Sequence, residues 1–214
     1  MSSLFFFHHP TTILISGPTH SGKTLFVLRV LKNSLLQPFP SRILWFFKEW
    51  QPAYDELKEI LPSTEFSHGI DSRVLDSINV ADKNLVVLDD LMSSAGESKI
   101  ITELFTQASH HKNLTVIFIV QNLFYQGKAM RTISLNAHYF VLYKNPRDRS
   151  QIRSLAQQIF PENYNFLVNV FKHATEQSYS YLVIDLHPET KEDFRILANI
   201  FPGESIRFYM PTTL

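Results

Sequence analysis

The sequence predicts an α/β fold with three layers, in which helices cover both faces of a mainly parallel sheet. Short apolar runs alternate with amphipathic helical patterns along most of the chain. Strands that alternate with helices pair in parallel, because each crossover helix returns the chain to the same end of the sheet. With 214 residues, of which 44% are hydrophobic, the chain can bury a substantial core. We therefore expect one domain spanning residues 1–214.

The expected strands are apolar runs bounded by turn residues. In chain order they cover residues 11–16, 41–50, 84–90, 113–122, 138–146 and 179–188. The run at 113–122 is rich in β-branched residues, which favour strands. Runs this apolar indicate strands that are buried on both faces of the sheet.

The expected helices lie between these strands. In chain order they cover residues 23–36, 53–61, 73–78, 98–111, 148–160 and 163–177. The first helix shows the pattern well, since Leu28, Leu31 and Leu35 recur at helical spacing. Residues 81–145 form the compact half in which we expect the chemistry, whereas residues 193–210 give no clear pattern.

A glycine-rich loop reading GPTHSGKT lies between the first expected strand and the first expected helix. It matches the phosphate-binding pattern G-x-x-x-x-G-K-[ST] in the context that this pattern requires. Lys23 would supply charge to the β- and γ-phosphates, and Thr24 a hydroxyl to Mg²⁺. The residues expected to bind the nucleotide are Gly17, Pro18, Thr19, His20, Ser21, Gly22, Lys23 and Thr24. The alternative is a glycine-containing turn without a ligand.

Two adjacent carboxylates, Asp89 and Asp90, end the buried run at 84–90. An acid at the tip of such a strand can hold Mg²⁺ beside the glycine-rich loop. Neighbouring side chains on a strand point to opposite faces, so the two acids act together only if the strand ends between them. We assign Asp89 to Mg²⁺, through water, and Asp90 to polarising the attacking water. Alternatively, Asp90 caps the following helix.

Gln121 ends the β-branched run at 113–122. An amide at a strand tip can sense the γ-phosphate or orient water, or it can form a turn with Asn122. If this strand lies between the loop strand and the Asp89 strand, Gln121 faces the nucleotide. That strand order is typical of motor-type ATPases and is absent from nucleotide kinases and GTPases.

Composition and missing motifs narrow the possible functions. Lys plus Arg and Asp plus Glu number 20 each, which argues against a protein that wraps DNA but not against a ring with few contacts. No guanine-binding [NT]KxD signature is present, although residues 145–153 could imitate a kinase lid. The chain has no cysteine, and its paired histidines show no ligand spacing, so we expect no zinc site. No apolar run is long enough to span a membrane.

Three stretches together resemble the FtsK/HerA superfamily of DNA-pumping ATPases: ILISGPTHSGKT, LVVLDD and VIFIVQN. The region from 105 to 148 is more specific and is similar to the genome-packaging ATPases of poxviruses, other large DNA viruses and Polinton/Maverick transposons. In that group an (Arg/His)-His-x-Asn stretch precedes the glutamine strand, and an Arg-…-Asn stretch follows it. The matching residues are His110, His111, Asn113, Arg131 and Asn136. The resemblance covers roughly residues 11–160.

The resemblance implies a P-loop NTPase domain of the RecA-like, ASCE type that hydrolyses ATP with Mg²⁺. It also implies a homo-oligomeric ring in which a neighbouring subunit supplies an arginine to each site. Lys112 stands where the resemblance implies that arginine, so the first candidates are Arg131, Arg147 and Arg149, and Lys112 is a candidate of lower rank. We expect the catalytic residues to be Lys23, Asp90, Gln121, Arg131 and Arg147.

The implied partners are double-stranded DNA and capsid portal or vertex proteins. Lys99, Lys128 and Arg131 could contact DNA phosphates, and no sequence-specific reader of bases is visible. The implied location is intracellular, in the cytoplasm or nucleus of a virus-infected cell, or in the virion. Two alternatives stay open: a helicase or replication-type ATPase, and a nucleotide-dependent switch with little turnover.

Overall fold

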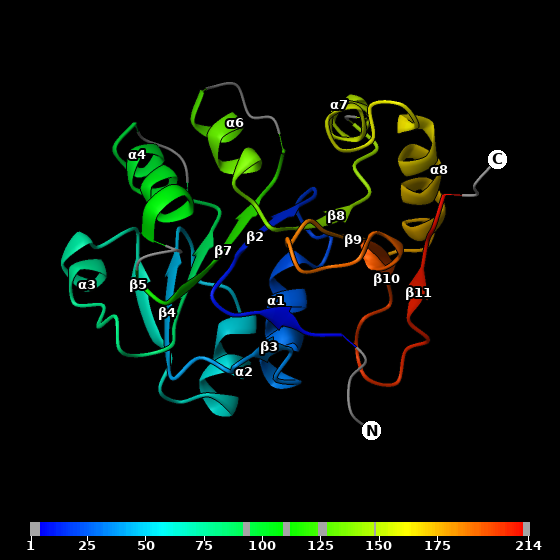
Figure 1. Ribbon diagram of the computed structural model, residues 1–214. Coiled ribbons are helices and arrows are strands. Elements are labelled where there is room, and N and C mark those ends of the chain that lie inside the picture. Colours follow the sequence, from blue (N-terminus) through cyan, green and yellow to red (C-terminus); the bar gives the residue numbers. More distant parts are fainter. Residues whose placement is uncertain (1–4, 92–94, 109–111, 124–127, 148, 212–214) are drawn as a thin grey trace.

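A nine-stranded sheet with the strand order β11-β10-β9-β8-β2-β7-β6-β4-β5 forms the centre of the molecule (Figure 1). The computed structural model describes residues 5–91, 95–108, 112–123, 128–147 and 149–211. The strands of the sheet are β2 (Thr12–Ser16), β4 (Arg42–Phe47), β5 (Glu65–His68), β6 (Asn84–Asp89), β7 (Leu114–Val120), β8 (Tyr139–Tyr143), β9 (Tyr181–Asp185), β10 (Ile196–Ala198) and β11 (Arg207–Phe208). A separate pair joins β1 (Phe7–His8) to β3 (Leu36–Gln37) in parallel.

The sheet has a parallel part and an antiparallel part. Strands β5, β4, β6, β7, β2 and β8 run parallel to one another. From β8 onward each neighbour is antiparallel, which adds β9, β10 and β11 at one side. The predicted α/β class with a mainly parallel sheet is therefore confirmed.

Helices cover both faces of the sheet. They are α1 (Lys23–Lys32), α2 (Ala53–Ile60), α3 (Ser72–Asp76), α4 (Ala95–Glu103), α6 (Lys128–Leu135), α7 (Ser150–Ile159) and α8 (Tyr164–Ala174), with a π-helical turn η1 (Leu104–Ala108) and a 3₁₀ turn η2 (Glu192–Phe194). Helices α1 and α2 pack on one face together with β1 and β3. The other helices pack on the opposite face, so the three predicted layers are present (Figure 1).

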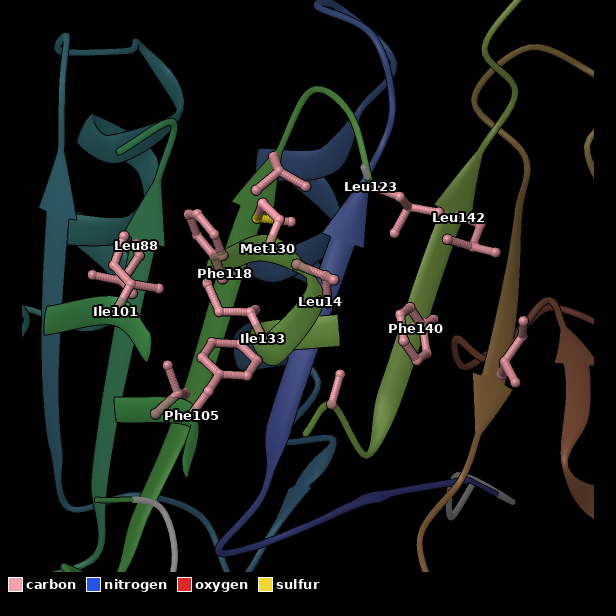
Figure 2. Packing of buried hydrophobic residues seen from close by; sticks show 14 of the residues in the cluster. Leu14, Leu88, Ile101, Phe105, Phe118, Leu123, Met130, Ile133, Phe140 and Leu142 are labelled. Atoms are coloured by element: carbon pink, nitrogen blue, oxygen red, sulfur yellow. The ribbon is translucent and has the colours of Figure 1, made fainter. Parts of the chain in front are cut away.

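Two apolar clusters, one on each face, hold these layers together. Alternate residues of a strand face opposite sides, so β2 gives Leu14 to one cluster and Ile13 and Ile15 to the other. Figure 2 shows the first cluster, where Leu14 and Phe118 from neighbouring strands meet side chains from α4, η1 and α6. Burial on both faces explains why the sequence of these strands is almost continuously apolar.

Several short elements differ from the prediction. Helix α1 ends at Lys32 instead of residue 36, because Leu36 belongs to β3 and is fully buried. The half-exposed strand β5 lies at one side of the sheet and has too few apolar residues to stand out. Strands β10 and β11 arise from residues 193–210, whose pattern had indicated nothing definite. These elements depend on tertiary pairing more than on local sequence preference.

Candidate functional site

The carboxyl ends of three central strands meet beside the glycine-rich loop. β7 pairs with β2 on one side and with β6 on the other, so the strand ending at Gln121 lies between the loop strand and the Asp89 strand. Parallel strands place their carboxyl ends at one edge of a sheet, which is where open α/β sheets bind ligands. This is the strand order expected of motor-type ATPases.

The glycine-rich loop wraps the start of α1. The Lys23 ammonium donates to the carbonyls of Gly17 and Pro18 at 2.7 and 2.8 Å. Gly22 precedes the helix with φ +98°, which glycine adopts without strain, and no side chain caps the helix. The free amides and dipole of this ten-residue helix therefore point toward the place where phosphates would lie.

Glycine is required at position 17 because the loop is tightly packed. A Cβ atom there would lie 2.5 Å from Tyr143 Cβ and 2.9 Å from Ser21 Oγ. The Ser21 hydroxyl is buried and has no hydrogen-bond partner within the described residues. An unpaired buried hydroxyl inside such a loop is a donor that a phosphate oxygen could satisfy.

The buried carboxylate of Asp89 has hydroxyl neighbours on two sides. Thr24 Oγ1 donates to Asp89 Oδ2 at 3.0 Å, and the buried Tyr54 hydroxyl donates to the same oxygen at 2.8 Å. Gln51 Nε2 lies 3.5 Å from it. Carboxylate and hydroxyl oxygens are the ligands that Mg²⁺ prefers, so the donor set of Thr24 and Asp89 fits this ion.

Asp90 lies just beyond the end of β6 and takes a different direction. The strand ends at Asp89, and Asp90 has φ +55°, in the left-handed region. Its exposed carboxylate accepts from Gln121 Nε2 at 3.1 and 3.3 Å. The two adjacent acids can therefore both line the same cavity, because the strand does end between them.

Burial and charge act against each other at this site. Burial raises the pKa of Asp89, whereas the hydrogen bonds from Tyr54 and Thr24 and the charge of Lys23 lower it. Burial also lowers the pKa of Lys23, and the carboxylates Asp89 and Asp90 raise it. Burial prevails in both groups, so the pKa of Asp89 is raised overall and that of Lys23 is lowered, although their opposite charges favour each other. The negative charge of Asp90 raises the pKa of both groups.

The cavity at this edge has a volume of about 630 Å³ and includes residues that the sequence had not indicated. Lys48, Trp50 and Gln51 follow β4, the neighbour of β6. Tyr179, from the connection between α8 and β9, lines the cavity on another side. The adjacency of β4 and β6 could have pointed to residues 48–51 had the strand order been known; no local signal marks Tyr179.

The candidate arginines do not line this cavity. Arg131 is exposed on α6, Arg147 is exposed in the turn before α7, and Arg149 occupies the N-cap position of that helix without a side-chain capping bond. Among the described residues that line the cavity, the basic ones are Lys23, Lys48 and His20. If Arg131, Arg147 or Arg149 contacts a bound nucleotide, that nucleotide would have to be in the cavity of another subunit.

The remaining residues that the resemblance singled out, together with Lys128, differ in their burial and their hydrogen bonds. Asn113 Nδ2 donates to the Asp82 carbonyl, which joins the connections before β7 and β6, and Asn136 Nδ2 donates to the Thr132 carbonyl at the end of α6. Lys112 is half-buried. His110 and His111 lie outside the described residues. Lys128 is exposed at the start of α6.

Comparison with solved structures identifies proteins that share this fold. The sequence matches no family model and no curated protein. The chain is similar to the DNA-packaging ATPase B204 from Sulfolobus turreted icosahedral virus, with a TM-score of 0.58 and 12% identity over 97% of this chain and 100% of that one. The chain has the fold of B204. At this identity the similarity shows the fold alone.

Two further structures agree with this assignment of the fold. The genome-packaging NTPase B204 of Sulfolobus turreted icosahedral virus 2, in complex with ATPγS, matches with a TM-score of 0.52 and 12% identity over 95% of this chain and 99% of that one. ATPases 2 and 3 of EssC from Geobacillus thermodenitrificans match with a TM-score of 0.50 and 13% identity, over 68% of this chain and 34% of that one. None of the helices in the described part of the chain has the length and apolar character needed to cross a membrane.

Proposed function

We propose that this protein is an ATP-hydrolysing motor that moves double-stranded DNA and packages a viral or virus-like genome into a capsid. The observation that carries the proposal is the position of β7 between β2 and β6, which brings Gln121 within hydrogen-bond distance of Asp90 beside the glycine-rich loop. The packaging activity named for the B204 neighbours supports the choice of DNA as the partner. The resemblance of the middle segment points the same way.

The residues of the loop would hold the triphosphate. The Lys23 ammonium, which donates to loop carbonyls, would exchange one of these hydrogen bonds for one to a phosphate oxygen. The amides at the start of α1 would donate to the other phosphate oxygens. Thr24 and Asp89 would hold Mg²⁺, which when bound neutralises charge on the phosphates. Tyr54 would keep the Asp89 carboxylate oriented through its hydrogen bond.

Asp90 and Gln121 would act on the attacking water. A carboxylate at this edge can polarise water, and an amide can orient it toward the γ-phosphate. Gln121 now donates to Asp90, so one of the two groups must turn before both can contact water. This pairing predicts slow turnover until DNA or a neighbouring subunit separates the two side chains.

A neighbouring subunit would supply the missing cation. Arg131 and Arg147 are exposed and lie away from the cavity of their own chain. An arginine contributed in trans stabilises the charge that develops during phosphoryl transfer. We therefore propose a homo-oligomeric ring, with portal or vertex proteins of a capsid as its docking partners in an infected cell or virion.

Two measurements test the motor assignment. The first is ATP hydrolysis with and without double-stranded DNA, which we expect to rise several-fold with DNA. The second is displacement of a third strand from a triplex on a long duplex, which reports movement along intact DNA. Hydrolysis without any response to DNA would favour a nucleotide-dependent switch, and unwinding of a forked duplex would favour a helicase.

Mixed assemblies test the shared site. Arg131→Ala should impair turnover and spare nucleotide binding, and mixing this variant with Lys23→Ala subunits should restore part of the activity. The same mixture with Arg147→Ala identifies which arginine acts. Absence of any recovery in either mixture would contradict catalysis in trans by these arginines.

A further inference from the structure

Tyr179 is an exposed aromatic residue at the rim of the nucleotide cavity. Its side chain is 70% exposed, and its backbone has φ +62°, a conformation that a bulky residue adopts at a cost. Its Cδ1 atom lies 3.4 Å from the position that a Cβ atom on Gly22 would occupy, so the ring sits against the loop. Core packing does not explain a tyrosine held in this way.

The strand order shows which end of the cavity Tyr179 occupies. Asp89, Asp90 and Gln121 end β6 and β7, on one side of the loop strand β2. Tyr179 precedes β9, and β9 pairs with β8 on the other side of β2. The ring therefore lies at the end of the cavity away from the acids.

This position fits the base of the nucleotide. If the γ-phosphate lies at the acids, as the proposed function requires, the triphosphate runs along the loop and the base leaves at the opposite end. An aromatic face gains favourable energy by stacking on a base, and either purine offers such a face. Trp50, another exposed aromatic side chain of the cavity, follows β4 beyond β6 and so lies on the acid side.

We propose that the Tyr179 ring is the base platform of this site and that recognition by stacking makes the protein accept purine nucleoside triphosphates as a class. The inference rests on the proposed function. Stacking does not read the edge of a base, so ATP and GTP should bind with similar affinity.

Binding measurements with three ligands test the proposal. Isothermal titration with ATP, GTP and inorganic tripolyphosphate would be run on the unmodified chain, on Tyr179→Ala and on Tyr179→Phe. Loss of the ring should weaken binding of ATP and GTP by roughly tenfold to a hundredfold. Tyr179→Phe keeps the ring and should bind as the unmodified chain does, and tripolyphosphate should bind all three proteins alike.

The outcomes separate the base platform from the phosphate site. Tyr179→Ala binding ATP normally, Tyr179→Phe losing as much affinity as Tyr179→Ala, or GTP binding more than about tenfold weaker than ATP would each overturn the proposal. Failure of tripolyphosphate to bind the unmodified chain would instead contradict the proposed function. Equal weakening of tripolyphosphate in Tyr179→Ala would assign the residue to loop structure and also overturn the proposal.

A cluster of possible metal ligands lies at the edge of the sheet opposite the nucleotide cavity. His8, His187 and Glu189 each present a ligand atom, and these atoms all lie within 4.8 Å of one another. The rings of His8 and His187 stack with centroids 4.5 Å apart. The sequence had indicated no partner for the paired histidines, because His8 and His187 are 179 positions apart and only the fold joins them.

Hydrogen bonds hold the backbone around His8, His187 and Glu189. The amide of His187 donates to Asp185 Oδ1 at 2.9 Å, and Thr190 Oγ1 donates to Asp185 Oδ2 at 2.9 Å. The Glu189 amide lies 3.4 Å from His187 Nδ1, and binding of an ion by Nε2 would place the ring proton on Nδ1 and break this long contact. The His8 amide donates to the Tyr139 hydroxyl at 3.3 Å.

We also infer that His8, His187 and Glu189 bind a divalent transition-metal ion such as Zn²⁺, with water as the remaining ligand. Two imidazoles and one carboxylate are a donor set that Zn²⁺ accepts. His8 and Glu189 are exposed and His187 is half-buried, so rotation of these side chains would bring the atoms to bonding distance. The ion would tie the N-terminal strand β1 to the connection after β9. This site is independent of the nucleotide cavity.

Zinc binding by an untagged protein tests the second inference. Titration with Zn²⁺, in millimolar Mg²⁺ that competes for the oxygen ligands of the proposed nucleotide site, should show one saturable site and a rise in melting temperature. His8→Ala and Glu189→Gln should weaken this binding at least tenfold, whereas His68→Ala, on β5, should not. No saturable binding at micromolar Zn²⁺, or unchanged binding in His8→Ala, would refute the site.

Discussion

The parallel strands β2, β7 and β6 and the antiparallel strands β9, β10 and β11 belong to one sheet but have different roles. The parallel strands all end at the same edge, so Asp89 and Gln121 converge on one cavity with the loop after β2. The antiparallel strands alternate in direction and mainly add buried side chains such as Leu197 and Val183. Strand direction, more than burial, decides where polar side chains can gather into a site.

Lys23→Ala should have the largest effect on the parallel side. Removing the ammonium takes away the charge nearest the expected phosphates, and we expect hydrolysis to fall by roughly 10²–10³-fold or more. Steady-state phosphate release measures the change. Lys83→Ala, at the amino end of β6, is the matched control, and equal hydrolysis in the two variants would exclude the loop as the catalytic phosphate site.

Leu197→Ala should affect the antiparallel side in a different way. Leu197 on β10 is fully buried, so its truncation leaves a cavity and should lower the free energy of unfolding by about 2–5 kcal/mol. Chemical denaturation measures this loss, and hydrolysis per folded molecule should stay unchanged. Leu135→Ala, at a position 65% exposed, should change stability by less than about 0.5 kcal/mol. A large loss of hydrolysis in Leu197→Ala would contradict the assignment of the catalytic site to the parallel strands alone.

Asp90→Asn separates catalysis from binding within the cavity. The amide keeps the size of the carboxylate but polarises water poorly, so we expect turnover to fall by roughly 10²-fold. Nucleotide binding, measured by titration, should stay close to that of the unmodified chain. Retained turnover would leave Asp90 with a local structural role at the end of β6.

Tyr54→Phe should have the smallest effect. It removes only the hydroxyl that donates to Asp89, and a hydrogen bond to a charged group contributes about 1.5–3 kcal/mol at most. We expect hydrolysis to need several-fold more Mg²⁺ for half-maximal rate, with little change at saturating Mg²⁺. An unchanged Mg²⁺ requirement would show that Asp89 needs no help from α2.

The sequence predicted the parallel side well because its strands are buried on both faces. Continuous apolar runs ending in Asp89 and Gln121 identify such strands without knowledge of their partners. The glycine-rich loop was equally clear, since its spacing reflects a fixed backbone path around phosphate. The hydrogen bond between Asp90 and Gln121 could not be predicted without the strand order. The sequence analysis could only state what would follow if β7 lay between β2 and β6.

Other features could not be predicted because they depend on contacts between distant segments. Tyr179 reaches the loop only through the pairing of β9 with β8. Tyr54 meets Asp89 because α2 packs on β4 and β6, and nothing in its local sequence marks the hydroxyl as a partner of a carboxylate. β10 and β11 are three and two residues long, too short for a periodic pattern to form.

Trp50 gives the cavity an optical signal of its own. The chain has only two tryptophans, and Trp45 is fully buried in the core while Trp50 is 42% exposed at the cavity wall. Its ring is held by Phe47, Tyr54 and Phe66, so its emission should respond to what enters the cavity more than to its own motion. Nucleotide binding and release can therefore be followed in real time by intrinsic fluorescence, without any label attached.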